Sequence, residues 1–353
     1  MSPQPRGVRP AGTGGPKLTV AVTGPTGEIG KPFIHALERT REVGRILGMA
    51  RSPFDPASHG WAKTEYRQGD VLDQSAVDDL VAEADVVVHL AFAVLNASDR
   101  TRDVNVQGSR NVFRAAAAAD KVTRLVYTSS VAAYGFHDDN PQPLTEDVPT
   151  RGTDAHPYSE QKAELERVLA EETSAAVGTD VYVFRPCIVA GPEARMLIEA
   201  IPYVQLGEKL PGVVRRLFDV VPVLKPVVPD PGVPFQLVHH DDVASALVAA
   251  VLGRGEPGVY NLAGEGEIGM SDLASELGWY SVPVPDLAVD ATAEIVARIP
   301  FAPAEATWVN AGRVPVVMDT AKARGTLRWR PEHSTRETLE QVVAASREEL
   351  EPA

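Results

Sequence analysis

A tyrosine, a lysine and a serine form the most chemically suggestive group of residues in this sequence. Tyr158 and Lys162 stand four positions apart in a segment of helical character, so both side chains share one helix face. A free phenol titrates at about 10, and a nearby ammonium together with an oxidised nicotinamide lowers that value by favouring the phenolate. Tyr158 could then give a proton to a carbonyl oxygen or remove one from an alcohol, while Ser130 hydrogen-bonds the same oxygen.

A glycine-rich turn near the start of the chain supplies the second pattern. Gly24, Gly27 and Gly30 follow the apolar run 18–22 and precede a helical stretch. Such a turn lets backbone N–H groups approach a pyrophosphate, and the helix N-terminus adds a favourable dipole. Glu28 is unusual here, because a carboxylate near phosphate is unfavourable unless it points outward. The residues predicted to hold the dinucleotide at this turn are Gly24, Thr26, Gly27, Glu28, Ile29 and Gly30.

The choice between NAD and NADP is made at the end of the second predicted strand. An acidic residue there would accept hydrogen bonds from a ribose 2′-hydroxyl and favour NAD. This chain instead has Arg51 and Ser52, with no carboxylate until Asp55. Arg51 could pair with a 2′-phosphate and Ser52 could donate a hydrogen bond to it. The sequence therefore predicts NADP as the preferred cofactor, with NAD as the alternative.

Composition narrows the class of protein. The net charge of −14 comes from 34 basic and 48 acidic residues, which argues against a nucleic-acid partner. The lone Cys187 excludes an intrachain disulfide and fits a reducing compartment. No segment reaches the roughly 20 apolar residues of a membrane span. Residues 1–16, rich in Pro, Gly and Arg, are predicted to form a disordered tail rather than a signal peptide, so we expect a cytoplasmic protein without membrane contact.

Apolar strands alternate with helices from residue 17 to residue 186. Strands buried on both faces that alternate with helices predict a parallel sheet covered by helices, the doubly wound Rossmann-type α/β fold. The expected strands are 18–22, 45–50, 86–90, 124–128 and 180–184. The expected helices between them are 31–41, 73–84, 103–119 and 157–170.

The character of the chain changes near Gly191. Prolines crowd residues 192–235, and proline at that density predicts an irregular cap rather than regular structure. A helix over 241–251 and a strand over 258–262 are expected to rejoin the sheet, and a polar helix is expected over 334–349. The predicted division is therefore a dinucleotide-binding domain of 17–190 plus about 236–262. A smaller, mainly C-terminal substrate-binding domain takes about 191–235 plus 263–345.

These motifs resemble the extended short-chain dehydrogenase/reductases, the NAD-dependent epimerase/dehydratase-like superfamily, from about Lys17 to Pro331. The resemblance implies that Ser130, Tyr158 and Lys162 are catalytic and that Asn105 is structural. It implies that Asp70 meets the adenine and that the segment after the fourth strand lines the cofactor. The further cofactor-binding residues implied are Asp70, Val71, Leu90, Ala91, Tyr158, Lys162 and Pro186.

Departures from the family pattern narrow the expected substrate. Val131 and Ala132 stand where sugar-nucleotide dehydratases carry an Asp-Glu pair, and Pro186-Cys187 stands near the position where epimerases commonly carry an asparagine. The pattern is similar to that of reductases and dehydrogenases acting on apolar carbonyls or secondary alcohols. Apolar residues of the cap, together with Phe92, Val94 and Leu95 after the fourth strand, are expected to line the pocket, although the cap residues could equally pack against the main domain or mediate dimer contacts.

Two alternatives share the same residues. One is an NAD(P)-dependent epimerase or isomerase, in which the cofactor is used transiently, and the other is a non-catalytic dinucleotide sensor. The expected partner is a small-molecule substrate, and by analogy helices 103–119 and 157–170 could form a homodimer contact. No metal site is predicted, because the histidines lack ligand spacing.

Overall fold

The computed structural model describes residues 17–93, 99–194, 225, 227–283 and 314–350. The predicted tail 1–16 lies outside the described residues. So do most of the proline-rich cap and the two proposed pocket residues Val94 and Leu95. Among the described residues, no helix combines the length and the apolarity that crossing a membrane requires.

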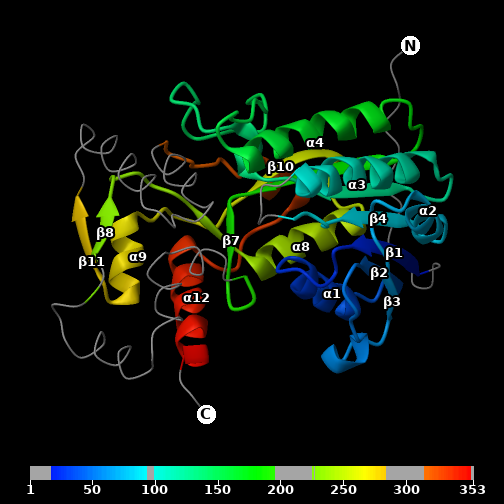
Figure 1. Cartoon of the computed structure of the whole chain (residues 1–353), viewed down its shortest axis with the longest axis horizontal. Helices are drawn as coiled ribbons and strands as arrows, with labels where there is room; N and C mark the ends of the chain where they lie inside the picture. The colour runs from blue at the N-terminus through cyan, green and yellow to red at the C-terminus, as the bar shows by residue number, and fades with distance from the viewer. Residues whose placement is uncertain (1–16, 94–98, 195–224, 226, 284–313, 351–353) are drawn as a thin grey trace.

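The described residues form a seven-stranded parallel sheet in the order β10-β6-β5-β4-β1-β2-β3 (Figure 1). The strand order reverses beside β1, which is the doubly wound arrangement predicted from the alternating pattern. The strands are β1 Leu18–Thr23, β2 Val43–Ala50, β3 Thr64–Gln68, β4 Val86–His89, β5 Arg124–Thr128, β6 Asp180–Pro186 and β10 Gly258–Leu262.

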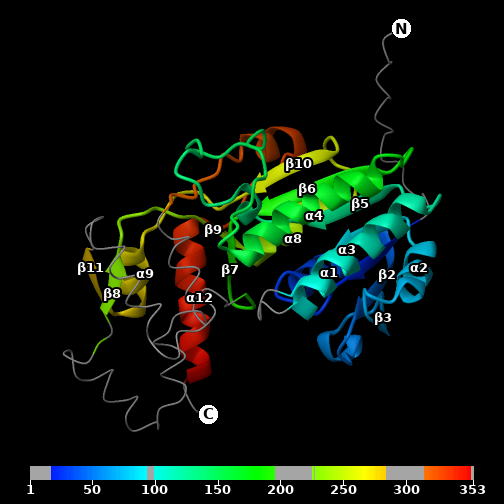
Figure 2. The same ribbon diagram turned by 45° about the horizontal axis from the view of Figure 1, so that its top comes forward.

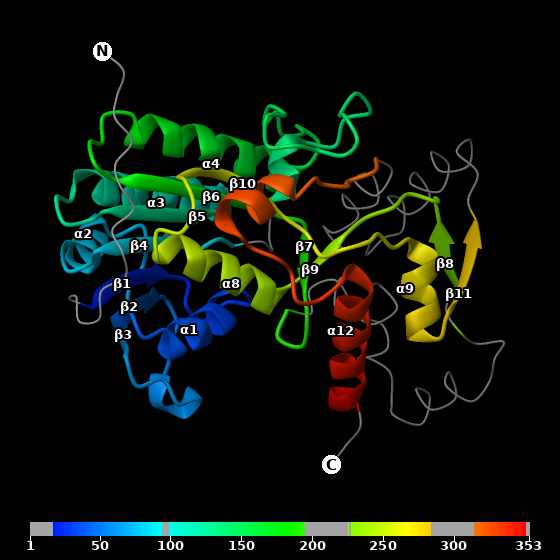
Figure 3. The same cartoon turned by 180° about the vertical axis from the view of Figure 1, so that it is seen from behind.

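Helices cover both faces of this sheet, and the side chains of successive residues in a strand point to opposite faces. Val20 and Val22 of β1 join the core under α1 and α8, whereas Ala21 joins the core under α2, α3 and α4 (Figures 1 and 3). Because both faces are covered, the central strands read as continuous apolar runs. The helices are α1 Gly30–Arg39, α2 Gln74–Ala82, α3 Asp99–Ala118, α4 Pro157–Thr173 and α8 His240–Val251.

One strand of the main sheet escaped the sequence prediction. β3, with the sequence Thr-Glu-Tyr-Arg-Gln, is the edge strand beside β2 and has no fully buried residue. An edge strand that faces solvent needs no apolar run, so nothing in its composition distinguishes it from a loop. The strand predicted over 258–262 is confirmed as β10, which pairs with β6 at the other edge.

A smaller group of elements lies beyond the carboxyl ends of β6 and β10 (Figure 2). Their shared core includes Leu237, Leu273 and Leu339. The prediction that prolines exclude regular structure from 192–235 is wrong at Pro229, which lies inside β8. β8 pairs with β11 alone, and proline is tolerated in a strand with a free edge. The elements of this group are β7 Ile188–Ala190, β8 Val227–Asp230, β9 Leu237–His239, α9 Met270–Leu277, β11 Tyr280–Pro283 and α12 Thr335–Leu350.

Short helical turns connect several of these elements. The 3-10 helix η2 Val131–Tyr134 follows β5 directly, and the 3-10 helix η1 Pro56–His59 follows β2. A π-helical turn, η5 Ala323–Leu327, precedes α12. Of these, η2 matters most for the site, because its N-cap is Ser130.

Candidate active site

The glycine turn after β1 depends on the absence of two side chains. Gly24 has a φ of 75°, and a Cβ at this residue would lie 2.8 Å from the backbone nitrogen of Ala91. A Cβ on Gly30 would lie 2.2 Å from the carbonyl oxygen of Gly24. At Gly27 the nearest atom is 3.6 Å from the Cβ position, so no contact within the chain demands glycine there. The turn therefore has the close backbone approach that a pyrophosphate cradle requires.

Thr26, Glu28 and Ile29 complete this turn and are half-buried. Ile29 is the residue before α1, and its side chain makes no capping hydrogen bond. In the first turn of α1 the Lys31 N–H donates to the Gly27 carbonyl oxygen at 3.0 Å, the Phe33 N–H donates to the Ile29 carbonyl oxygen at 3.2 Å, and Pro32 has no N–H. The N–H of Gly30 is therefore the donor of this turn that keeps its capacity to bind an anion.

Arg51 and Asp70 lie together at the carboxyl ends of β2 and β3. They line an open hollow of about 430 Å³ with Gln68 and Gly69. Gln68 Nε2 donates to the carbonyl oxygen of Arg51 at 3.0 Å and holds the two strand ends together. The Arg51 side chain is exposed and has no hydrogen-bond or ion-pair partner among the described residues. The Arg51 cation and the Asp70 carboxylate thus line one hollow, where the sequence predicts the ribose and the adenine of the dinucleotide.

Ser52 and Val71, which follow Arg51 and Asp70 in the sequence, do not line this hollow. The carbonyl oxygen of Ser52 accepts a hydrogen bond from the Tyr66 hydroxyl, which fixes the backbone after β2. Val71 is buried in the core and packs on Gly108 of α3, where a Cβ would lie 2.4 Å from Val71 Cγ2. The Val71 side chain therefore packs in the protein core, whereas Asp70 lines the hollow.

The segment after β4 is joined to the glycine turn. The Leu90 N–H donates to the Thr23 carbonyl oxygen at 3.1 Å, and Ala91 lies against Gly24. Beneath them, His89 Nδ1 lies 2.7 Å from Thr23 Oγ1, and His89 Nε2 lies 2.8 Å from Ser109 Oγ. Burial, assisted by the charge of Lys162, lowers the pKa of His89 to about 3. A neutral imidazole therefore links β1, β4 and α3 under the predicted cofactor-lining segment.

Ser130, Tyr158 and Lys162 come together at the carboxyl end of β5. Ser130 lies two residues after the end of β5 and is the N-cap of η2, and Tyr158 and Lys162 lie in the first two turns of α4. A hydrogen bond joins the side chains of Ser130 and Tyr158. Lys162 Nζ donates to the Thr128 carbonyl oxygen at 3.1 Å. The three predicted residues thus lie together, with Lys162 Nζ 5.8 Å from the centroid of the Tyr158 ring.

Burial dominates the ionisation of this group. It raises the pKa of Tyr158, and the hydrogen bond to Ser130 only partly opposes that rise. Burial lowers the pKa of Lys162 to about 7, and the charge of Glu166 opposes that shift. In this structure burial therefore outweighs the hydrogen bond to Ser130, and the lowering of the phenol pKa expected from the ammonium together with an oxidised nicotinamide stays a prediction.

The Tyr158 ring contacts the rings of Phe92 and His156, and the sequence analysis did not predict how close Phe92 lies to Lys162. The Phe92 ring centroid is 4.0 Å from Lys162 Nζ. The same ring packs edge-to-face on Tyr158 with centroids 5.5 Å apart. On the other side of Tyr158 lies His156, at 6.3 Å, and His156 in turn packs on Phe136 at 5.2 Å.

Asn105 fixes the backbone at Ala93, the residue after Phe92. Its Oδ1 accepts from the Ala93 N–H at 2.8 Å, and its Nδ2 donates to the Ala93 carbonyl oxygen at 3.0 Å. Nδ2 also donates to Gln161 Oε1 at 2.8 Å. The buried amide therefore ties the segment after β4 to α4 beside Lys162, which explains the structural role that the resemblance implied.

Glu166 is a functional neighbour that the sequence analysis missed. Its carboxylate accepts hydrogen bonds from Arg185 at 2.9 and 2.5 Å and from Ser129 Oγ at 2.6 Å. Both members of the ion pair are buried, at 6% and 10% side-chain exposure. The available signal was spacing, because Glu166 follows Lys162 by four residues on the helix face that also carries Tyr158. Pro186, predicted at the nicotinamide, is buried at the end of β6, directly after Arg185.

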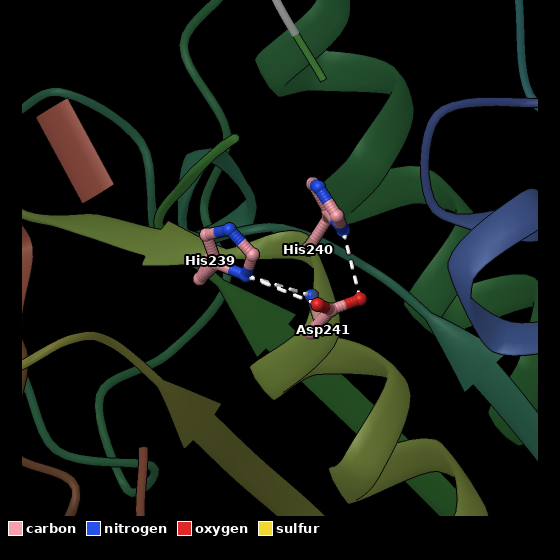
Figure 4. Close-up of side chains that lie close together, drawn as sticks. All are labelled: His239, His240 and Asp241. Carbon is pink, nitrogen blue, oxygen red and sulfur yellow. Dashed lines mark hydrogen bonds and ion pairs between the residues drawn. The ribbon is translucent and has the colours of Figure 1, made fainter. Parts of the chain in front are cut away.

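His239, His240 and Asp241 gather at the start of α8 (Figure 4), although no metal site was predicted from their spacing. Two imidazoles and a carboxylate form a donor set that suits a divalent metal. Hydrogen bonds already use Nδ1 of both imidazoles and Nε2 of His240. His239 Nδ1 accepts from the Asp241 N–H at 3.2 Å, and His240 Nδ1 lies 3.1 Å from Asp241 Oδ1. His240 Nε2 accepts from the Glu193 N–H at 3.4 Å, so both imidazoles have protein partners and the predicted lack of a metal stays a prediction.

Comparison with known proteins decides the family. The model of the NAD dependent epimerase/dehydratase family matches residues 20–263, which is more than half of the 353-residue chain. The chain belongs to this family. The predicted membership of the NAD-dependent epimerase/dehydratase-like superfamily is thereby confirmed.

Relatives of known sequence match parts of the chain. An uncharacterized protein, y4nG of Sinorhizobium fredii, is 29% identical over 235 residues, covering 66% of this chain and 53% of that protein. The N-acetyl-alpha-D-glucosaminyl-diphospho-ditrans,octacis-undecaprenol 4-epimerase of Escherichia coli O157:H7 is 36% identical over 131 residues. That match covers 36% of this chain and 38% of the epimerase. The chain thus spans about half or less of these two relatives.

Solved structures share the whole fold at low identity. The Bordetella bronchiseptica enzyme WbmH in complex with NAD+ superimposes with a TM-score of 0.67 and 20% identity, covering 94% of this chain and 99% of that one. The UDP-glucose 4-epimerase of Thermotoga maritima with UDP-glucose gives a TM-score of 0.68 and 20% identity, covering 95% and 100%. At this identity the likeness establishes the Rossmann-type architecture.

Proposed function

We propose that this protein is an oxidoreductase that transfers hydride between NADP(H) and a largely apolar carbonyl or secondary alcohol. The observation that carries the proposal is the assembly of Ser130, Tyr158 and Lys162 at one strand end, opposite the glycine turn. When bound, the nicotinamide supplies or accepts the hydride. The substrate is a small molecule.

The catalytic residues divide the proton chemistry among themselves. Tyr158 donates its hydroxyl proton to the carbonyl oxygen as that oxygen becomes an alkoxide, and takes a proton back in the reverse direction. The Ser130 hydroxyl, already bonded to Tyr158, orients the same oxygen. Lys162, when protonated, favours the phenolate that remains on Tyr158. Its Nζ, which donates to the Thr128 carbonyl oxygen, would also bind the nicotinamide ribose.

Replacing Tyr158 with phenylalanine tests the chemistry directly. The variant keeps the ring packed on Phe92 and loses the proton donor, so we expect turnover to fall by about 100- to 10,000-fold. Dinucleotide affinity, followed by cofactor fluorescence, should remain within about twofold of that of the unmodified protein, because only the hydroxyl is removed. Tyr280→Phe on the exposed surface of β11 is the matched control. Turnover in Tyr158→Phe equal to that of the control would remove Tyr158 from the mechanism.

Cofactor preference follows from Arg51. An exposed guanidinium at the mouth of the hollow can pair with a 2′-phosphate, whereas Asp70 on the same hollow remains for the adenine. We expect tighter binding of NADPH than of NADH, and a loss of about 10-fold or more in NADPH affinity for Arg51→Ala, because one charge-assisted contact disappears. NADH affinity should not change, and Arg330→Ala, an exposed arginine elsewhere, should change neither. Preference of the unmodified protein for NADH would refute the assignment.

A second candidate is a sugar-nucleotide 4-epimerase in which the cofactor is reduced and reoxidised in one cycle. The relatives favour it, because both the Escherichia coli protein and the Thermotoga maritima structure are 4-epimerases. It would use the same three catalytic residues. The two candidates separate by the reduced-nicotinamide absorbance: a reductase consumes NADPH in proportion to product, whereas an epimerase leaves the total unchanged while the sugar isomerises.

A further inference from the structure

Two side chains of β3 hold the backbone that follows β2. The Tyr66 hydroxyl donates to the carbonyl oxygen of Ala50 at 3.0 Å and to that of Ser52. Gln68 Nε2 donates to the carbonyl oxygen of Arg51 at 3.0 Å. Three consecutive carbonyl oxygens therefore accept hydrogen bonds from side chains of one strand. We call Tyr66 and Gln68 the β3 pair.

The geometry of the two strands explains why the β3 pair reaches this backbone. Side chains two residues apart in a strand point to the same face, and β2 and β3 end opposite each other at Ala50 and Gln68. The ring of Tyr66 contacts the same connection, because its centroid lies 5.6 Å from that of Phe54. Phe54 in turn packs on the buried Trp61 at 5.1 Å. Both the ring and the hydroxyl of Tyr66 thus hold the segment after β2.

The Arg51 side chain depends on this backbone for its position. The side chain is exposed and has no hydrogen-bond or ion-pair partner in the part of the chain that the structure describes. Asp70 lines the same hollow, yet no ion pair joins it to Arg51, and its Oδ1 accepts from the Leu72 N–H at 3.0 Å. The guanidinium is therefore available to an anion. Ordering a long side chain costs binding free energy, and a backbone that is already fixed lowers that cost.

We propose that the β3 pair positions Arg51 for the 2′-phosphate of NADP(H) and thereby helps to set the cofactor preference. The inference rests on the proposed function, because it presupposes that Arg51 binds that phosphate. NADH has no 2′-phosphate, so the β3 pair contributes to the binding of NADPH and not to that of NADH. Tyr66 and Gln68 are positioning residues in this scheme, because they act through Arg51.

Fluorescence titrations with NADPH and NADH test this without turnover. Tyr66→Phe keeps the ring on Phe54 and removes the hydroxyl, and Gln68→Leu removes the amide donor. In each variant we expect the dissociation constant of NADPH to rise by about 2- to 10-fold, because Arg51 must then be ordered during binding. The dissociation constant of NADH should stay unchanged, which also shows that the variant is folded.

Two substitutions elsewhere remove the same kinds of hydrogen bond. Tyr182→Phe removes a hydroxyl that donates to the Gly255 carbonyl oxygen at 3.2 Å. Gln142→Leu removes an amide that donates to the Pro315 carbonyl oxygen at 2.6 Å. Neither residue lines the hollow, so both controls should leave the two dissociation constants unchanged.

A double-variant cycle with Arg51→Ala separates positioning from other roles. If the β3 pair acts through Arg51, adding Tyr66→Phe or Gln68→Leu to Arg51→Ala should cause no further loss of NADPH affinity. A residue that only stabilises the fold would weaken the binding of NADPH and NADH alike. A residue that binds the phosphate itself would still matter for NADPH after Arg51 is removed. Either of these results would overturn the inference.

The same titrations separate the inference from the function on which it rests. A preference for NADPH that depends on Arg51 and not on the β3 pair would overturn the inference alone. A preference of the unmodified protein for NADH would overturn the assignment of NADP and the inference with it, and would leave the chemistry of Tyr158 to its own test. Binding of neither dinucleotide would overturn the proposed function as a whole.

Discussion

Replacing Glu166 with glutamine removes the only negative charge that the structure shows bonded to Arg185 among the described residues. The carboxylate receives hydrogen bonds from Arg185 at 2.9 and 2.5 Å and from Ser129 at 2.6 Å. The two charged side chains are 6% and 10% exposed, so water does not replace the lost partner. The guanidinium cannot lose its proton to escape the cost, because its pKa is raised above its ordinary value.

The size of the effect follows from this burial. Breaking a buried ion pair by removing one partner costs about 3–5 kcal/mol, because the remaining charge is left uncompensated in a poorly solvated place. Glutamine keeps the shape and one acceptor oxygen, so we expect a loss at the lower end, about 3 kcal/mol. The Arg336–Asp272 pair, at 57% and 32% exposure, is the matched control, and Arg336→Gln should cost about 0–1 kcal/mol.

Urea unfolding at neutral pH measures both variants. The denaturation midpoint of Glu166→Gln should fall with little change in slope, and the midpoint of Arg336→Gln should barely move. The double variant Glu166→Leu with Arg185→Met should recover most of the loss, because no charge is then stranded. Equal midpoints for Glu166→Gln and Arg336→Gln would refute the argument that burial gives this pair its importance.

Three further predictions concern the site. Gly30→Ala should destabilise the protein by about 1–3 kcal/mol and abolish dinucleotide binding by fluorescence titration, since its Cβ would lie 2.2 Å from a backbone oxygen; unchanged binding would contradict the steric argument. Lys162 has a folded pKa of about 7 against an ordinary value of 10.5, so the unfolded chain binds the proton more tightly and stability rises with pH across that interval. From pH 7 to pH 9, unfolding measurements should show about 2 kcal/mol more gain for the unmodified protein than for Lys162→Met, and parallel pH profiles would refute the shift. Asn105→Ala strands the N–H and carbonyl groups of Ala93, and it should cost at least about 2 kcal/mol in urea unfolding; a loss below about 0.5 kcal/mol would mean that water takes over those bonds.

Strands and helices of the main sheet were predictable because each carries its own local signal. β5 was predicted with its observed bounds, and β10 likewise, since apolar runs buried on both faces differ from everything around them. β3 gave no such signal, because an edge strand with polar residues satisfies its environment without an apolar run. Pro229 gave the wrong signal, because proline removes one backbone donor, and a two-stranded sheet leaves one edge where that donor is not needed.

The sequence by itself determined the glycine turn and the group of Ser130, Tyr158 and Lys162. The glycine turn and the pair of Tyr158 and Lys162 depend on spacing along one turn or one helix face, which the chain order fixes locally, whereas Ser130 belongs to a different element. The hydrogen bonds of Asn105 to Ala93 agree with the structural role that the resemblance implied, whereas the contact of Asp70 with an adenine stays a prediction.

Only the tertiary structure decided which residues from distant elements meet. The contacts join parts of the chain that are distant in sequence. Phe92 lies over Lys162, Glu166 accepts hydrogen bonds from Ser129 and Arg185, and Arg51 lies beside Asp70. Parallel strands bring their carboxyl ends to one edge of the sheet, so loops far apart in sequence converge there. Burial at that edge then sets the pKa values of Tyr158 and Lys162, because desolvation depends on everything packed around a group and on no single stretch of sequence.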